Sequence, residues 1–164
     1  MHITNIITVS SVNITLDLNK ISQENMNIVY NPQKFTAAVW RHRKICGSLL
    51  LFPNGKIIHL GPPGEKAPRI YIRQFVRILH KQGWSVQLAP MRRVCMSGVH
   101  QLSGPINLCD IPGGHYNPEV LNAAILKRDT VTYNIFYTGK VIITGIKNTN
   151  TVYPVLLELE LFTQ

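Results

Sequence analysis

The chain has 164 residues, of which 45% are hydrophobic and only 15% are charged, a composition that excludes an intrinsically disordered chain. This length suffices for one domain, or for two half-domains that share a core. Lysine and arginine total 17 against eight acidic residues, which gives a net charge of +9. So positive a balance favours a polyanionic partner, either nucleic acid or an anionic membrane surface.

The cysteines and the N-terminal segment indicate the cellular compartment. Cys46, Cys95 and Cys109 form no CxxC pair, and three scattered cysteines predict reduced thiols in an intracellular protein. The first 18 residues lack a basic n-region and a continuous apolar stretch, so no secretory signal is expected. No apolar run approaches the length of a membrane span. We expect almost the whole chain to be core domain, without an N-terminal extension.

In chain order, the first half predicts strands followed by one long helix. The expected elements are strands at residues 5–12, 35–43, 47–52 and 56–60, and helices at 16–23 and 65–84. The Pro-Asn-Gly turn between the last two strands is a typical hairpin signal. Pro68 is tolerable near the first turn of the long helix. Gly83 and Trp84 are expected to close that helix, and Trp40 to pack in the core beneath the helices.

The second half predicts a similar series of elements. The expected elements are strands at residues 93–99, 122–128, 131–136 and 140–144, a helical turn at 106–110, and a helix at 151–162. Strands that alternate with so few helices predict an α+β fold, with the helices on one face of an antiparallel sheet.

An internal repeat organises the chain. YNPQKF at 30–35 recurs as YNPEVL at 116–121, and FPNGKIIHLG at 52–61 recurs as FYTGKVIITG at 136–145. The two offsets are 86 and 84 residues. One repetition at so long a period predicts two similar half-domains, residues 1–90 and 91–164, in one continuous domain.

The repeated strand is apolar on both faces. In its first copy Phe52 and Ile58 share one face while Ile57 falls on the other. Two helices can cover one side of such a sheet, so the other side should expose apolar side chains among basic ones, which normally marks a binding surface. The pattern leaves two interpretations open: a surface for the DNA minor groove, or a dimer or domain interface with ordinary solvated cations.

The repeated YNPQKF and Gly-Lys motifs, in this order, resemble the core domain of the TATA-box-binding protein family. The opening NIITVSSVNITLDLNKIS is also similar to that family's first strand and helix, and the similarity runs from about residue 5 to about residue 157. The resemblance implies a saddle of two pseudo-symmetric repeats that form a curved antiparallel sheet with helices on the convex face. The concave face would bind the minor groove and bend the duplex.

The resemblance also assigns roles to individual residues of the first half. Phe35 and Phe52 match the pair that kinks DNA, and Asn5 matches the asparagine that hydrogen-bonds in the groove. The full set of expected DNA contacts in this half is Asn5, Ile7, Lys34, Phe35, Arg41, Leu50, Phe52, Lys56, Ile58 and Leu60. Leu60 departs from the family, which usually has threonine there.

The second half departs further from the family pattern. Its expected DNA contacts are Cys95, Ser97, Leu121, Lys127, Asn134, Phe136, Lys140, Ile142 and Thr144. Cys95 replaces asparagine, Ser97 replaces valine and Leu121 replaces the first kinking phenylalanine. Asn134 stands where the family has an apolar residue, and the segment from Leu121 to Phe136 is two residues shorter than its first-half counterpart. These departures argue against strict TATA preference, whereas minor-groove binding stays expected because charge and bending supply much of the affinity.

The opposite face of such a fold recruits other proteins. Arg69, Arg73 and Arg77 match the family's basic helix, which implies docking of a factor IIA-like protein or of repressors. Glu119 matches the loop that meets a factor IIB-like protein, although Asn117 stands where an acid is usual. Without the resemblance, a solvated basic face explains the arginines equally well.

Catalytic and metal sites are not expected. The six histidines show no ligand spacing, and the eight acidic residues offer no clustered pair. GPPGEK at 61–66 lacks the spacing of a phosphate loop and indicates a strand-to-helix turn. His59 falls on the helix side of its strand, where packing is expected. The chain is therefore expected to be neither an enzyme nor a cofactor carrier.

The expected function is that of a DNA-binding general transcription initiation factor in the nucleus, or at the site of viral transcription if the chain is viral. It would bind and bend promoter DNA as a monomer that could dimerise off DNA, and would recruit basal factors of IIA and IIB type without any membrane. One alternative is a protein-interaction module or decoy with little sequence-specific DNA binding. Another is a reader of RNA–DNA hybrids or damaged DNA within a larger enzyme.

Overall fold

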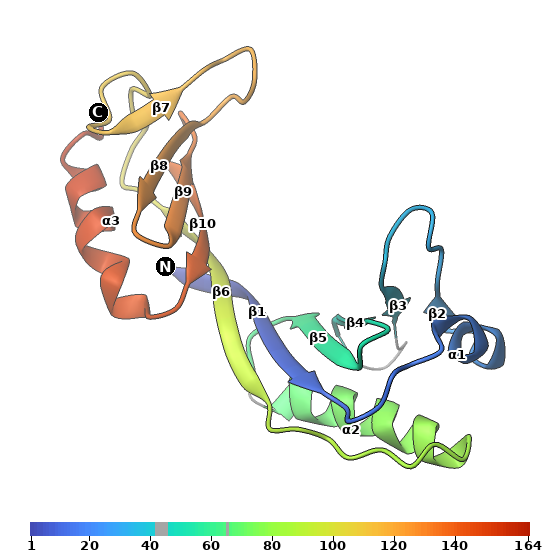
Figure 1. The fold of residues 1–164 in the computed structure, drawn as a ribbon. Coiled ribbons are helices and arrows are strands. Elements are labelled where there is room, and N and C mark those ends of the chain that lie inside the picture. The colour runs from blue at the N-terminus through green and yellow to red at the C-terminus, as the bar shows by residue number, and fades with distance from the viewer. Residues whose placement is uncertain (42–45, 65) are drawn as a thin grey trace. The chain divides into compact units, whose positions relative to one another are not determined.

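The computed structural model describes residues 1–41, 46–64 and 66–164 (Figure 1). The chain divides into two compact units. The N-terminal unit comprises residues Asn5–Val94, and the C-terminal unit comprises Met1–Thr4 together with Cys95–Gln164. The architecture is α+β with antiparallel strand pairs, as the sequence predicts. No helix among the described residues is both long and apolar enough to cross a membrane.

In the N-terminal unit, strands lie in the order β2-β3-β4-β5-β1, and every neighbouring pair is antiparallel. The strands are β1 (His2–Ser11, whose first residues belong to the C-terminal unit), β2 (Ile28–Val29), β3 (Ala38–Trp40), β4 (Ser48–Leu51) and β5 (Lys56–Gly61). The helices are α1 (Leu18–Glu24) and α2 (Lys66–Lys81).

The core of the N-terminal unit lies between its sheet and its helices. Trp40 of β3 is buried as predicted, with its ring 5.1 Å from that of Tyr71 and 6.0 Å from that of Phe75, both on α2. Figure 1 shows α2 running along one side of the strands of this unit. Full burial of one such side chain stabilises the fold by roughly 1.5–3 kcal/mol. The face of the sheet that packs against the helices therefore forms part of the core.

Local signals fix the ends of both helices. Asp17 caps α1 by accepting a 3.1 Å hydrogen bond from the backbone N–H of Lys20. Pro68 lies in the first turn of α2, where no backbone donor is needed. After α2, Gly83 adopts a φ of 82° and the N–H of Trp84 donates to the carbonyl of Leu79 at 3.0 Å. This left-handed cap confirms that Gly83 and Trp84 close the helix.

The C-terminal unit repeats the arrangement, with strands in the order β6-β10-β9-β8-β7. The elements are β6 (Arg92–Gln101), β7 (Gly114–Tyr116), β8 (Ala124–Arg128), β9 (Val131–Ile135), β10 (Lys140–Ile146), the 3-10 helix η1 (Thr149–Thr151) and α3 (Tyr153–Glu160). Leu156 and Leu159 of α3 are buried, and the Glu160 carboxylate accepts hydrogen bonds from the Ser103 hydroxyl at 2.6 Å and its N–H at 3.0 Å. These contacts fasten the C-terminal helix to the loop after β6.

Several expected boundaries shift. The strand expected at 35–43 begins at Ala38, and residues 42 and 43 lie outside the described residues. The helical turn expected at 106–110 is a non-helical turn, because the Asn107 side chain accepts from the Cys109 N–H at 3.2 Å and donates to Asp110 at 2.7 Å. The last helix is shorter than expected, with Pro154 in its first turn and a 3-10 turn before it.

Candidate nucleic-acid interface

The face of the N-terminal sheet opposite the helices carries a row of apolar residues. Register places Val39 opposite both Val29 and Leu50, and Ile58 opposite both Leu50 and Val9. Val29 is exposed and the other four are half-buried, whereas their sequence neighbours Ala38, Trp40, Leu49, Leu51 and Ile57 are buried. We call the row Val29, Val39, Leu50, Ile58 and Val9 the N-terminal face. It is the uncovered apolar surface that the alternation of the strands predicts.

Three further predicted contacts lie beside this row. Leu60 pairs with Ile7 of β1, and both side chains are half-buried on the same side of the sheet as Ile58. Asn5 precedes Ile7 by two residues, so strand alternation gives it the same side. The structure therefore gathers five predicted residues (Asn5, Ile7, Leu50, Ile58 and Leu60) on one surface.

Phe35 and Phe52, the predicted DNA-kinking residues of the first half, flank one end of a strand pair. We call them and their second-half equivalents, Leu121 and Phe136, the wedge residues. Phe35 stands three residues before Ala38, Phe52 follows Leu51 directly, and Ala38 pairs with Leu51. The Phe35 side chain is 46% exposed, which leaves the ring accessible to a ligand. The Lys56 ammonium lies 5.8 Å from the centre of the Phe52 ring. Lys34 and Arg41 are exposed near the ends of the loop and of β3.

The corresponding row in the C-terminal unit is interrupted by polar residues. Register places Ile125 opposite His115 and Asn134, and Ile142 opposite Asn134 and Val99. We call this row the C-terminal face. His115 is exposed and the other four are half-buried. Among the predicted contacts nearby, Thr144 and Lys127 both pair with Thr132, and Lys140 is exposed at the start of β10.

Strand pairing aligns the two faces without reference to any other protein. Val9 lies opposite Ile58 as Val99 lies opposite Ile142, so Val9 and Val99 are equivalent. Counting back along β1 and β6 makes Cys95 equivalent to Asn5, and Ser97 equivalent to Ile7. One difference is local: the pairing of β10 with β6 shifts between Ile143 and Ile146, opposite Ser97, which is typical of a β-bulge.

The loops that carry the wedge residues have the same backbone hydrogen bonds. The N–H of Phe35 donates to the Asn31 carbonyl at 2.9 Å, and that of Leu121 donates to the Asn117 carbonyl at 3.0 Å. The side chains of Asn31 and Asn117 cap their own turns equivalently. Leu121 is 38% exposed and lies before β8 as Phe35 lies before β3.

The turns after the wedge strands also match. The N–H of Phe52 donates to the Lys56 carbonyl at 3.0 Å, and the N–H of Phe136 donates to the Lys140 carbonyl at 2.9 Å. Phe136 follows Ile135, the partner of Ala124, so Leu121 and Phe136 flank one end of the strand pair β8–β9. Each half thus presents two apolar side chains in the same local frame.

Charge is divided unequally between the units. The N-terminal unit holds 13 lysine and arginine residues against three acidic ones, a net +10. The C-terminal unit holds four against five, a net −1. The net charge of the whole chain does not reveal this division. Counting the charged residues of each repeat separately does.

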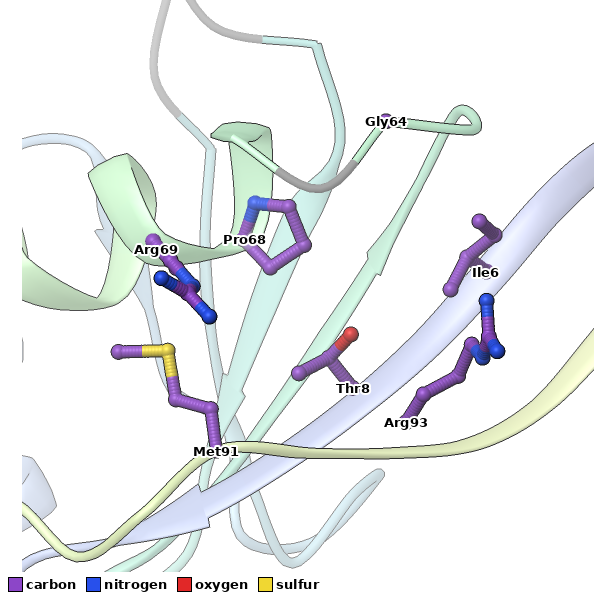
Figure 2. A pocket seen from close by; sticks show the side chains of 7 residues that line it. All are labelled: Ile6, Thr8, Gly64, Pro68, Arg69, Met91 and Arg93. Carbon is purple, nitrogen blue, oxygen red and sulfur yellow. The ribbon is translucent and has the colours of Figure 1, made fainter.

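The helix side of the N-terminal unit carries the predicted protein-docking residues. Arg69, Arg73 and Arg77 are exposed along α2, and no ion pair of theirs is found among the described residues. Arg69 lines a pocket of about 300 Å³ together with Arg93, Thr8 and Met91 (Figure 2). Figure 2 shows Thr8 between the two arginine side chains. Two guanidinium groups therefore line the same pocket.

The other predicted docking residue lies in the C-terminal unit. Glu119 is exposed in the loop before β8, where its N–H donates to the Asn117 side chain at 3.1 Å. Its carboxylate is accessible to a partner.

His59 is a core residue, as predicted. Its side chain is fully buried with its ring 5.4 Å from that of Tyr71, and neither ring nitrogen has a hydrogen-bond partner among the described residues. Burial lowers the pKa of His59, which favours the neutral ring. Elsewhere in the described part of the chain, no three His, Cys, Asp or Glu side chains gather as a metal site.

Sequence reasoning missed three members of the N-terminal face: Val9, Val29 and Val39. Val29 lies on a strand of only two residues, which is too short to show periodicity. Val9 and Val39 lie on expected strands, and the alternation that selects Ile7 on β1 also selects Val9.

Comparison with known proteins adds independent information. Residues 1–82 and 95–158 match the family model described as transcription factor TFIID (or TATA-binding protein, TBP). The chain is 30% identical over 156 residues to the TATA-box-binding protein of Spodoptera frugiperda, covering 91% of this chain and 51% of that protein. It is 31% identical over 166 residues to the Caenorhabditis elegans TATA-box-binding protein, covering 93% and 49%. The chain thus spans about half the length of the curated relatives it matches.

A solved structure has the same fold. The Methanococcus jannaschii TBP superposes with a TM-score of 0.79 at 24% identity, over 97% of this chain and 95% of that chain. At this identity the match establishes the fold.

Proposed function

Because the chain belongs to the family of transcription factor TFIID, or TATA-binding protein, we propose that it binds promoter DNA in the minor groove and bends it. Proteins of this family are DNA-binding transcription factors and not enzymes. A nuclear site of action follows from that role. The observation that carries the proposal is the uncovered apolar face, which occurs in both units with two exposed or half-exposed wedge residues beside it.

The chemistry of this surface suits the minor groove. The groove has a narrow floor between two phosphate chains, and proteins that bind it combine strands, apolar wedges and cations. Apolar residues such as Leu50 and Ile58 would lie against the floor. Phe35 and Phe52 would enter a base step, at a cost of about a few kcal/mol per step that the wider contact offsets. Phe136 and the leucine equivalent to Phe35 would do the same in the second half.

Cations flank the face where phosphates would lie. The proposed phosphate contacts are Lys34, Arg41, Lys56, Lys127 and Lys140, all exposed. Neutralising five phosphates would give a slope of log K against log salt of about −4.5, because each contributes about −0.9 on B-DNA. The remaining proposed contacts, Asn5, Ile7, Leu60, Cys95, Ser97, Asn134, Ile142 and Thr144, would face the base edges.

The helix side would recruit basal factors. Arg69, Arg73 and Arg77, for which the described residues supply no ion pair, offer a basic stripe to an acidic surface of a factor IIA-like protein. Glu119 would contact a factor IIB-like protein. The pocket beside Arg69 supports this role because a partner carboxylate could meet two guanidinium groups there.

A second candidate function is a protein-interaction module without sequence-specific DNA binding. The polar residues of the C-terminal face and the net charge of −1 on that unit favour it, since both weaken a DNA contact. Such a module would show no salt-dependent affinity for duplex DNA, which distinguishes it from the first candidate.

The test is fluorescence anisotropy at fixed moderate salt, with a TATA-containing duplex and a scrambled duplex of equal length. A donor–acceptor pair at the duplex ends reports bending. We expect selective binding with a rise in energy transfer. Weak, equal binding to both duplexes without any change in energy transfer would contradict the proposal and favour the interaction module.

A further inference from the structure

Asn134 occupies the middle of the C-terminal face. It pairs with Ile125 on one side and Ile142 on the other, so its carboxamide lies between two aliphatic side chains. The residue is half-buried, and its side chain makes no hydrogen bond with any other described residue. The repeat equivalent is Leu50, between Val39 and Ile58. The two halves therefore differ chemically at the same point of the face.

A carboxamide at this point would lose its water when the face closes on DNA. A polar group that loses water without gaining a partner is unfavourable, so Asn134 needs a hydrogen-bonding group in the groove. The minor-groove floor of an A·T pair offers only acceptors, whereas a G·C pair adds the donor N2 amino group of guanine. Because a carboxamide both donates and accepts, Asn134 can satisfy either pair.

The aliphatic equivalent cannot do this. Leu50 offers no acceptor, so a guanine amino group against it would be buried without a partner. On β10 and β6 of the C-terminal unit, the hydroxyls of Thr144 and Ser97 add further groups that donate and accept. In the N-terminal unit, Ile7 stands at the position equivalent to Ser97.

We propose that the C-terminal half of the site accepts G·C pairs as well as A·T pairs, and that Asn134 is the specificity-determining residue that meets the guanine amino group. At the equivalent point of the N-terminal half, Leu50 accepts an A·T pair only. This inference rests on the proposed minor-groove function. It predicts an asymmetric recognition sequence, with one A·T-rich half and one half of mixed composition.

The experiment measures affinity for four duplexes that differ in the base pairs of their half-sites. In the first duplex both half-sites contain only A·T pairs. In the second, one half-site carries a G·C pair, which is moved through successive positions, and in the third both half-sites carry it. The fourth is the second duplex with inosine in place of guanine. Inosine lacks the N2 amino group, so it isolates that group from other effects of the sequence. The wild-type chain can bind the duplex in either of two orientations, so its C-terminal half can bind whichever half-site carries the substitution.

For the wild-type chain we expect equal affinity for the A·T duplex and the singly substituted duplex. The duplex with both halves substituted should bind about tenfold or more weakly, the usual effect of one mismatched pair. The Asn134→Leu variant should bind the A·T and inosine duplexes with unchanged affinity, and should bind the guanine duplex about tenfold more weakly.

Leu50→Asn is the matched control, because it places the same carboxamide at the equivalent position. It should restore binding to the duplex substituted in both halves. If the wild-type chain binds the singly substituted guanine duplex as weakly as Asn134→Leu does, the inference is wrong while minor-groove binding stands. Failure to bind any of the duplexes would overturn the proposed function as well, and this inference with it.

Discussion

At the scale of residues, the four wedge positions differ in a single chemical respect. Phe35, Phe52 and Phe136 are aromatic, and Leu121 is not. The loop hydrogen bonds of Phe35 and Leu121 are alike, so the difference lies in the side chain rather than in its placement. An aromatic ring stacks on an opened base step with more area than an isobutyl group does.

We therefore expect Phe35→Ala or Phe52→Ala to reduce DNA bending far more than Leu121→Ala does. The measure is energy transfer between dyes at the ends of a bound duplex. Leu121→Phe is the complementary variant and should increase the bend. Equal losses from the three alanine variants would refute the idea that the first half contributes the stronger wedge.

His59 gives the protein a pH-dependent stability. Burial lowers its pKa in the folded chain, so the unfolded chain binds the proton first as pH falls below about 6.5. The free energy of unfolding should be highest above that pH and should decrease as pH falls toward the lowered folded value. Urea unfolding from pH 7.5 to pH 5 measures this slope.

The variant that tests this is His59→Ile, since the repeat equivalent of His59 is the buried Ile143. It should flatten the slope, because isoleucine cannot bind a proton. An unchanged slope in His59→Ile would show that another group causes the pH dependence.

At the scale of elements, the two Gly-Lys turns explain why the motif is repeated. Gly55 and Gly139 have φ of 80° and 78°, and a side chain at either would collide with backbone carbonyl oxygens. At Gly55 these are the carbonyls of Val12 and Ile14, each 2.5 Å from the position of a Cβ. Only glycine meets both the backbone angle and the lack of space.

Gly55→Ala should lower the free energy of unfolding by more than the roughly 1–3 kcal/mol of a left-handed non-glycine residue. Gly83→Ala is a suitable control. Gly83 also has a positive φ, 82°, but no atom lies within 4 Å of its Cβ position. Urea denaturation compares the two, and equal losses would mean that the backbone angle accounts for the whole effect.

The elements also mark what the sequence can and cannot predict. The hairpins, the long helix and its glycine cap follow from local chemistry, and these predictions are confirmed. The strands β2 and β7 have two and three residues, too few for any periodicity, and tertiary pairing alone defines them. The turn at residues 107–110 has helix-compatible letters, but a side-chain hydrogen bond of Asn107 favours the turn.

The site, like the fold, is predictable from the sequence only in part. The wedge positions come from the family resemblance, and the repeated motifs align those of the two halves. The resemblance makes Cys95 equivalent to Asn5, and the strand register gives the same equivalence independently. The local bulge opposite Ser97 could not be foreseen, because a register shift depends on how β6 and β10 meet.

At the scale of the whole molecule, the charge resides in one unit. Lys56 and Lys140 are repeat equivalents, so they allow the same substitution to be compared in two units of different net charge. Each neutralisation, Lys56→Gln or Lys140→Gln, should reduce the magnitude of the salt slope by about 0.9. Salt titrations of duplex binding measure it.

Lys20→Gln provides the control. Its ammonium lies 5.6 Å from the Trp84 ring, among the helices rather than on the N-terminal face, so its loss should leave the slope unchanged. If Lys140→Gln also left the slope unchanged while Lys56→Gln reduced it, the C-terminal unit would make no phosphate contact at that position.

The division of charge also gives the binding reaction an order in time. Long-range attraction accelerates diffusional encounter, and here it acts on the unit with net +10 and not on the unit with net −1. The N-terminal unit is therefore captured first, at a rate that falls steeply with ionic strength. Engagement of the C-terminal unit then follows as a unimolecular step on the tethered complex. It is less sensitive to salt, because only Lys127 and Lys140 of this unit are proposed to contact phosphate, and it is paced by opening of the second base step. Stopped-flow traces should resolve these as two phases, of which only the first varies with DNA concentration.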